Sequence, residues 1–388
     1  MKKTIPFQVA LALMVFIPAT ALAQEARSTP WLVAITSNSS SWSASGLDSE
    51  GVQNVQYAQL SRREQGWGVA VTGKYVNTSY TNQTGGGKLE ISSPTKTSIA
   101  SYLNYERGAM TLRGGVDLDL PTGKNSYSDI EVEQLITDPL SEDLMMINTY
   151  GEGSNVIPHA LVAYAFTKAF SVGVGMKYEM TGKYDITVDT EGDELDPGDR
   201  ILAMANAALK LSDERYLILT ASYASATEDK QKDAPVYRQG EITAFELRGM
   251  NTFNSGLTLI ASAAVKSQGK NQTLGEGNQL APELVNSNNN SWQVFAAGTY
   301  PVTGKIKAAA VAGYKVVSAN GYEEGHPLQD AGRTAMFIEP GAKWSPKESM
   351  YVTLKGRYTA ISDNKDTFSK EDASYTVTNL DLGLAWAF

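Results

Sequence analysis

Cysteine is absent from the 388-residue sequence, and histidine occurs only twice, at His159 and His326. The absence of cysteine excludes disulfide scaffolds, thiolate zinc sites, iron–sulfur clusters and cysteine nucleophiles. Imidazole chemistry would depend on those two histidines, and neither lies in a recognisable catalytic motif. We therefore predict no catalytic residues, no metal site and no cofactor.

Positive charge and long apolar runs are also scarce. Lys and Arg total 33 against 42 Asp and Glu, and the resulting net charge of -9 argues against a nucleic-acid partner. Beyond the N-terminal segment, no stretch has the ~20 consecutive apolar residues that a membrane helix requires. At 42% hydrophobic and 19% charged residues, the composition is also unlike that of a disordered chain.

The N-terminus has the order of residues found in secretory signal peptides. Lys2 and Lys3 precede an apolar stretch, residues 5–23, that ends in Ala-Leu-Ala. An uncleaved membrane helix is the alternative, but two prolines interrupt the stretch. We predict that residues 1–23 are a signal peptide and that residues 24–388 form one domain.

The remaining sequence alternates apolar and polar residues with a period of two, which is typical of β-strands. In residues 170–178, for example, Phe, Val, Val, Met and Tyr alternate with Ser, Gly, Gly and Lys. About sixteen such segments occur, with 14–18 as the range. They begin near Trp31, Val52, Trp67, Thr97, Met110, Ile157, Phe170, Arg200, Tyr216, Glu241, Leu257, Ser291, Ile306, Arg333, Tyr351 and Tyr375.

Alternation alone fits a soluble sandwich as well as a membrane barrel, but the connections separate the two. Short connections, such as residues 167–169 and 302–305, alternate with long polar ones at residues 81–95, 121–156, 189–199, 228–240, 270–290, 319–332 and 362–373. Tight turns on one rim and long loops on the other are typical of transmembrane barrels. We predict an all-β, closed antiparallel transmembrane β-barrel with short periplasmic turns and long extracellular loops.

Aromatic residues cluster at the ends of the predicted strands, as expected at membrane–water boundaries. One group lies at the short-turn ends and comprises Trp31, Trp67, Phe166, Phe170, Tyr216, Tyr300, Trp344 and Trp386. The opposite ends carry Trp42, Trp292 and Tyr375. The distribution predicts two aromatic girdles around the barrel.

The last residues provide the most specific motif. Leu382, Leu384, Trp386 and Phe388 share one face of the final strand, and the sequence stops on the aromatic residue. This ending resembles the assembly signal of Gram-negative outer-membrane barrels. The resemblance implies the cell outer membrane as the location and the barrel insertion machinery, membrane lipid and lipopolysaccharide as partners. A homotrimer is left open.

The polar face of the strands carries the charges that would line a lumen. The selectivity candidates are Lys74, Arg113, Asp117, Asp119, Lys177, Glu179, Arg248, Lys355 and Arg357. On this face basic residues outnumber acidic ones, which predicts a mildly positive wall. The longest connection carries the constriction-loop candidates Asp129, Glu131, Glu133, Asp138, Glu142 and Asp143. The alternative is that all these charges are simply solvated.

The segment Pro121-Thr122-Gly123-Lys124 leaves a predicted strand within DLDLPTGKNSYSD. It resembles the Leu-Pro-Thr-Gly segment of the outer-membrane family linked to the meta-pathway of phenol degradation, a distant relative of fatty-acid channels. The resemblance implies passage of small, hydrophobic compounds. The alternative is a proline–glycine turn.

These observations predict an outer-membrane channel for the passive diffusion or transport of small solutes through a charged aqueous lumen. Two alternatives remain: a transporter of hydrophobic or aromatic compounds, and a surface adhesin or scaffold without transport. Pro340 lies inside a predicted strand and lacks an N–H donor, so we expect a bulge or a gap in the ladder there.

Overall fold

The structure is a computed structural model that describes residues 29–45, 49–82, 87–124, 144–145, 153–185, 194–275, 277, 279–365 and 373–388. Among these residues no helix is long and apolar enough to cross a membrane. The predicted signal peptide and the six constriction-loop candidates lie outside the described residues.

One large antiparallel sheet of 17 strands forms the body of the molecule. Its strands are β1 (Thr29–Ser45), β2 (Ser49–Arg63), β3 (Trp67–Asn82), β4 (Gly87–Pro94), β5 (Thr97–Arg107), β6 (Met110–Leu120), β7 (Asn155–Ala165), β8 (Phe170–Glu179), β11 (Arg200–Lys210), β12 (Arg215–Ala226), β15 (Ile242–Thr252), β16 (Thr258–Gln268), β19 (Ser291–Pro301), β20 (Ile306–Val317), β21 (Arg333–Lys347), β22 (Met350–Asp363) and β23 (Ala373–Ala387).

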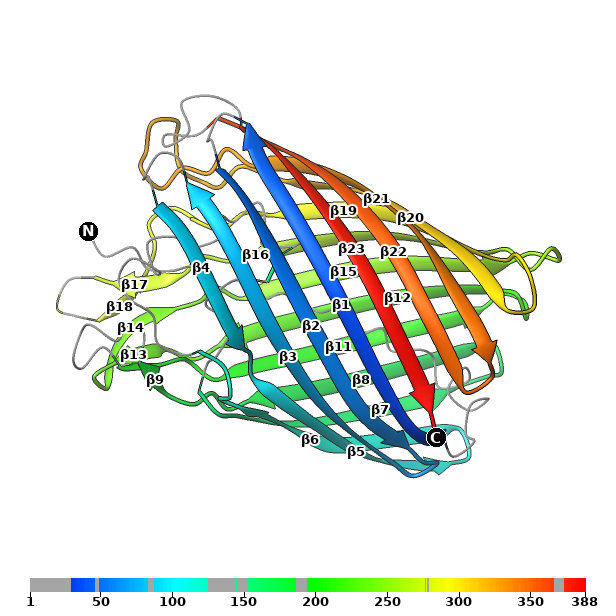
Figure 1. Ribbon diagram of the computed structural model, residues 1–388. Helices are drawn as coiled ribbons and strands as arrows, with labels where there is room; N and C mark the ends of the chain where they lie inside the picture. The colour runs from blue at the N-terminus through cyan, green and yellow to red at the C-terminus, as the bar shows by residue number, and fades with distance from the viewer. Residues whose placement is uncertain are drawn as a thin grey trace.

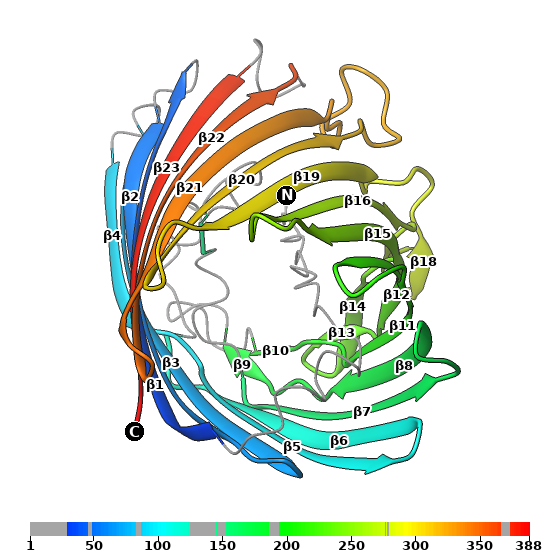
Figure 2. The same cartoon turned by 90° about the vertical axis from the view of Figure 1, so that its right-hand side faces the viewer.

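The sheet closes on itself, because the last strand pairs with the first. Ile35 of β1 lies opposite Leu384 of β23, and the Phe388 N–H donates to the Trp31 carbonyl at 2.9 Å. Strands β4 and β5 both pair with β3 and are two halves of one interrupted strand. The ring therefore has sixteen strands, which confirms the predicted closed antiparallel barrel (Figure 2).

The interruption between β4 and β5 corrects one prediction. Residues 81–95 were expected to be a long loop, but β3 runs to Asn82 and β4 occupies Gly87–Pro94. The glycines at 85–87 and Pro94 are strong turn signals, and they mask the short alternation around Ile91. The Thr95 N–H donates to the Lys74 carbonyl and rejoins the ladder after the proline.

The long connections of the outer rim contain a second, unpredicted sheet. It has six short strands: β9 (Tyr184–Asp185), β10 (Glu194–Asp196), β13 (Asp229–Gln231), β14 (Ala234–Arg238), β17 (Gln272–Leu274) and β18 (Leu280–Pro282). It lies at the rim opposite the short turns, on the left in Figure 1, and β10 and β13 fall inside the ring in end view (Figure 2). Strands of two to five residues are too short for alternation to reveal them.

The outward face of the barrel is apolar. Interior and exterior residues alternate along every strand, and one set contains the exposed large hydrophobic side chains, such as Leu247, Phe245 and Met336. Because convex side chains splay apart whereas concave ones converge, this exposed set faces outward. The exposed Trp67, Phe166, Tyr300, Trp344 and Trp386 mark the short-turn rim, and the exposed Trp292 lies near the outer rim.

Three aromatic residues were assigned to the girdles incorrectly. Trp42 and Tyr375 are each only 3% exposed and face inward. Tyr216 also shares the inward set of residues on β12, where Lys210 Nζ lies 6.0 Å from its ring centroid. Position along a strand predicted depth in the membrane for these residues, but not the face on which they lie.

The wall formed by β21–β23 and β1–β3 is taller than the rest. Its strands have 14 to 17 residues, whereas the other full strands have 10 to 12. A transmembrane strand requires ~9–11 residues, so the tall wall projects beyond the membrane. Figure 1 shows these strands rising at the upper left.

In this projecting part the polarity of the two faces is reversed. Outward positions carry Ser39, Ser41 and Ser43, whereas the inward face holds an apolar core of Trp42, Val76, Ile91, Tyr375 and Val377 with their neighbours. Gly51 makes room for the Trp42 indole, because a Cβ there would lie 2.2 Å from its ring. The upper wall thus has the polar exterior and apolar interior of a water-soluble sheet.

Pro340 marks a gap in the ladder, as predicted. It pairs with Ala310 of β20, but the pairing of β21 with β22 skips from Ile338 to Gly341. The register is the same on both sides of the gap, so no residue is inserted. A proline without an N–H therefore lies where that ladder is already open.

The reversal of polarity predicts position-dependent effects of lysine on the outward face. Leu247→Lys, at the centre of β15, puts a charge against lipid and should lower the free energy of unfolding by ~2–4 kcal/mol. Ser41→Lys, on the outward face of the projecting wall, should change it by less than ~1 kcal/mol. Equilibrium urea unfolding in liposomes measures both variants. Equal losses would contradict the assigned membrane boundary.

Candidate functional site: the lumen wall and its outer mouth

The strand registers place all nine selectivity candidates on the inward face. They lie on β3, β6, β8, β15 and β22 and form several separate groups around the ring. Their role in selecting solutes stays a prediction. The structure adds the hydrogen bonds, ion pairs and ring contacts that residues in these groups make.

On β5–β8 the inward charges are mostly paired. Asp119 is buried, accepts a hydrogen bond from Ser98 Oγ at 2.6 Å, and lies 2.9 Å from Lys96 Nζ. Arg113 Nε donates to Asn104 Oδ1 at 2.7 Å, and its guanidinium lies 4.4 Å from the Tyr102 ring centroid. This side of the wall is polar and close to neutral.

His159 is the one histidine on the lumen wall within the described chain. Its Nδ1 lies 3.6 Å from Asp117 Oδ2, and Gly115 leaves space for its ring. His326 lies in the outer-rim segment and stacks on Tyr322 at 4.2 Å between ring centroids. His159 is thus positioned by a carboxylate and His326 by an aromatic ring.

Two further pairs lie on the opposite part of the wall. Arg248 Nη2 contacts Glu246 Oε1 at 2.6 Å, and the same carboxylate oxygen accepts from Ser262 Oγ at 2.5 Å. Lys355 Nζ lies 3.5 Å from Glu339. These cations therefore have local counter-ions that reduce their effective charge.

The longest connection reaches the inward face of the barrel. The Gln53 side chain donates to the Met145 carbonyl and accepts from the Met145 N–H, both at 2.7 Å. Leu144 is buried within the apolar core of the projecting wall. Sequence reasoning missed this contact, since nothing in the spacing of residues links position 53 to position 145.

The Pro121–Lys124 segment packs against the break between β4 and β5. Thr122 Oγ1 donates to the Thr95 carbonyl at 2.7 Å, and the Lys124 N–H donates to Ser93 Oγ at 2.9 Å. The segment therefore closes the interrupted strand. This contact supports the interpretation of the motif as a structural turn.

Repeated polar contacts hold the outer-rim connections together. Asn155, Asp229 and Asn271 accept hydrogen bonds from the N–H groups of Gly182, Gly198 and Gly240, respectively. A Cβ at any of these glycines would lie within 2.6 Å of backbone from the neighbouring connection. The glycines thus permit close approach, and one side-chain oxygen holds each crossing.

The acidic rim segment is partly neutralised. Lys183 Nζ lies 3.3 Å from both Asp233 and Glu194, and the hydrogen bonds and charge of these carboxylates raise its pKa. Within the described part of the chain, no three His, Cys, Asp or Glu side chains form a group that could hold a metal ion.

No protein-family model and no curated protein matches this sequence. Among solved structures, Pseudomonas aeruginosa OpdQ is similar at 10% identity and a TM-score of 0.47, covering 92% of this chain and 99% of that one. A bacterial polysaccharide outer membrane secretin has 8% identity, a TM-score of 0.47, and coverage of 93% and 99%. A P. aeruginosa FadL homologue has 9% identity, a TM-score of 0.44, and coverage of 92% and 90%.

The location follows from the barrel itself. In lipid every backbone N–H and C=O must be paired internally, and a closed barrel with an apolar exterior meets that requirement. The chain is an outer-membrane β-barrel.

The contact between Gln53 and Met145 can be tested because the chain has no native cysteine. In a Leu144→Cys protein the single thiol should react slowly with maleimide. Adding Gln53→Ala removes the two hydrogen bonds to Met145, worth ~1 kcal/mol each, and should raise the labelling rate about 30-fold. Gln56→Ala, on the outward face of the same strand, is the matched control. Equal rates in both backgrounds would contradict this attachment.

Asp229 should make the rim sensitive to pH. Burial raises its pKa above the ordinary 3.8, against the lowering by the Gly198 N–H and Arg200. The folded protein therefore binds this proton more tightly than the unfolded chain. The associated stability is complete below pH 3.8 and is lost as pH rises through the folded pKa.

Asp229→Asn keeps the acceptor oxygen and removes the charge, as asparagine already does at positions 155 and 271. We expect stronger hydrogen-exchange protection of the Gly198 amide than in the unsubstituted protein at pH 7, and no difference at pH 3.5. Exchange rates corrected for intrinsic chemistry measure this. Identical protection of the Gly198 amide in the two proteins at pH 7 would contradict the cost of burying the Asp229 carboxylate.

Proposed function

We propose that this protein is a channel through which small polar solutes diffuse passively across the outer membrane. The observation that most directly supports this proposal is the composition of the inward face. There, charged and amide side chains from strands around the ring replace a packed apolar interior. A barrel of ~16 strands is wide enough for an aqueous path. The proposed passage involves no covalent step.

The lumen charges would set the preference among solutes. Several carboxylates are already paired with cations, as at Arg248–Glu246 and Lys355–Glu339. Basic residues outnumber acidic ones on the inward strand positions, so the field inside should favour anions. Lys74, Lys177 and Arg357 are the candidates through which this preference would act.

A second candidate is the passage of hydrophobic or aromatic compounds. The observation that favours it is the apolar core on the inward face of the projecting wall, which includes Trp42, Ile361 and Tyr375. Loss of growth on aromatic substrates, without a change in ion conductance, would favour this candidate over diffusion of polar solutes.

Purified protein in planar bilayers should show stable conductance steps, with a reversal potential on the anion side in a KCl gradient. Arg248→Gln leaves Glu246 without its cation and should move the reversal potential toward cation selectivity. Arg215→Gln removes the same charge from the outward set of β12 residues and should leave it unchanged. A folded but silent barrel would contradict the channel and favour an adhesin or scaffold.

A further inference from the structure

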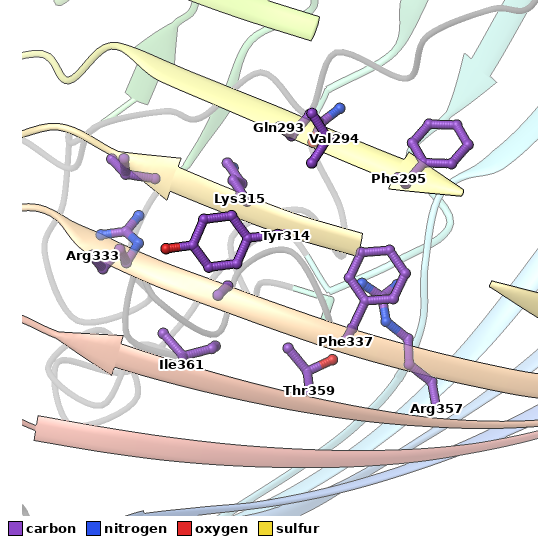
Figure 3. A pocket seen from close by; sticks show the side chains of 12 residues that line it. Gln293, Val294, Phe295, Tyr314, Lys315, Arg333, Phe337, Arg357, Thr359 and Ile361 are labelled. Carbon is purple, nitrogen blue, oxygen red and sulfur yellow. The ribbon is translucent and has the colours of Figure 1, made fainter. Parts of the chain in front are cut away.

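A cavity of about 240 Å³ opens on the inward face of four neighbouring strands, β19–β22. The residues that form it lie in the outer halves of these strands, between the barrel centre and the outer rim (Figure 3). At ~30 Å³ per water molecule in the liquid, the cavity has room for a single-ring organic molecule. It is therefore smaller than the site of a drug-sized ligand.

The charge around this cavity is positive. Lys315, Arg333 and Arg357 line it, and none of its lining residues is acidic. Arg333 Nη1 has a carboxylate at 3.7 Å, Asp330 Oδ2, which lies outside the lining. The three cations come from β20, β21 and β22, so three neighbouring strands place positive charge around one cavity.

The cavity also has an aromatic and aliphatic side. The guanidinium of Arg357 lies 3.9 Å from the Phe337 ring centroid, and Phe295 lines the cavity from β19. Gly313 lies under the Phe337 ring, where a Cβ would come within 2.4 Å of it. Ile361 joins this cavity to the apolar core of the projecting wall.

One polar group in the cavity has no partner among the described residues. Thr359 is 2% exposed, and its Oγ1 makes no hydrogen bond to any described residue. Buried hydroxyl groups are normally hydrogen-bonded. Figure 3 shows the Thr359 side chain on the same lining as Arg357 and Phe337. A ligand oxygen that accepts from this hydroxyl would satisfy it.

We propose that this cavity is a binding site for small organic carboxylates with an aromatic or apolar body. The carboxylate would lie among Lys315, Arg357 and the Thr359 hydroxyl, and the ring would lie against Phe295 and Phe337. The proposal rests on the proposed channel function, because it names the class of solute that the channel takes up. Inorganic anions would share the cations but not the aromatic side.

Equilibrium binding of radiolabelled benzoate to the detergent-solubilised barrel tests the site directly. We expect saturable binding that excess benzoate displaces and that benzyl alcohol, a neutral compound of similar shape, does not. Lys315→Gln should weaken binding about tenfold through loss of a charge-assisted hydrogen bond. Lys307→Gln, eight residues earlier on the same inward face of β20, is the matched control.

Phe337→Leu separates the two halves of the proposal, since it should weaken benzoate binding but leave acetate binding unchanged. Heat-modifiable gel migration verifies that each variant is folded. Absence of saturable binding, or equal effects of Lys315→Gln and Lys307→Gln, would overturn the site. Conductance without benzoate binding would refute the site alone, whereas benzoate binding to a silent barrel would refute the channel alone.

Discussion

The ladder between β23 and β1 is the interaction on which the rest of the structure depends. Hydrocarbon offers no hydrogen-bond partner to backbone groups, so any open edge would leave a row of unpaired N–H and C=O groups in lipid. Pairing of the last strand with the first removes both edges at once. Closure then divides every strand into an outward and an inward set of residues, and the apolar exterior and charged interior follow from it.

The tall wall shows that the polarity of the outward and inward sets depends on the solvent that each face meets, and not on the strand itself. Along β1 the outward set changes from Val33 and Ile35 to a series of serines, while the inward set changes from polar residues to Trp42. The backbone ladder continues unchanged through this point. One strand can therefore be a membrane strand in its lower part and half of a water-soluble sheet in its upper part, with Leu144 covering the apolar side.

Alternation and loop length were sufficient to predict the sixteen strands and the inward set of charges, because both patterns repeat along the whole chain. They could not predict where the polarity reverses, and Trp42 and Tyr375 were misplaced for that reason. The rim strands were missed because strands such as β9 and β10 have only two and three residues. The contact of Gln53 with Met145 was also missed, since it is set by tertiary packing.

The cavity on β19–β22 illustrates the same limit at the level of a site. Arg357 was predicted as a lumen residue from its own strand, but its association with Lys315 and Arg333 depends on the registers of three strands. A channel subsite must also bind weakly enough to release its solute. A cation whose charge is partly neutralised by a nearby carboxylate, as that of Arg333 is by Asp330, holds a solute anion less tightly. Such cations meet the requirement better than a fully desolvated cluster would. An open cavity on the wall of a wide lumen can thus concentrate a carboxylate near the entrance without trapping it.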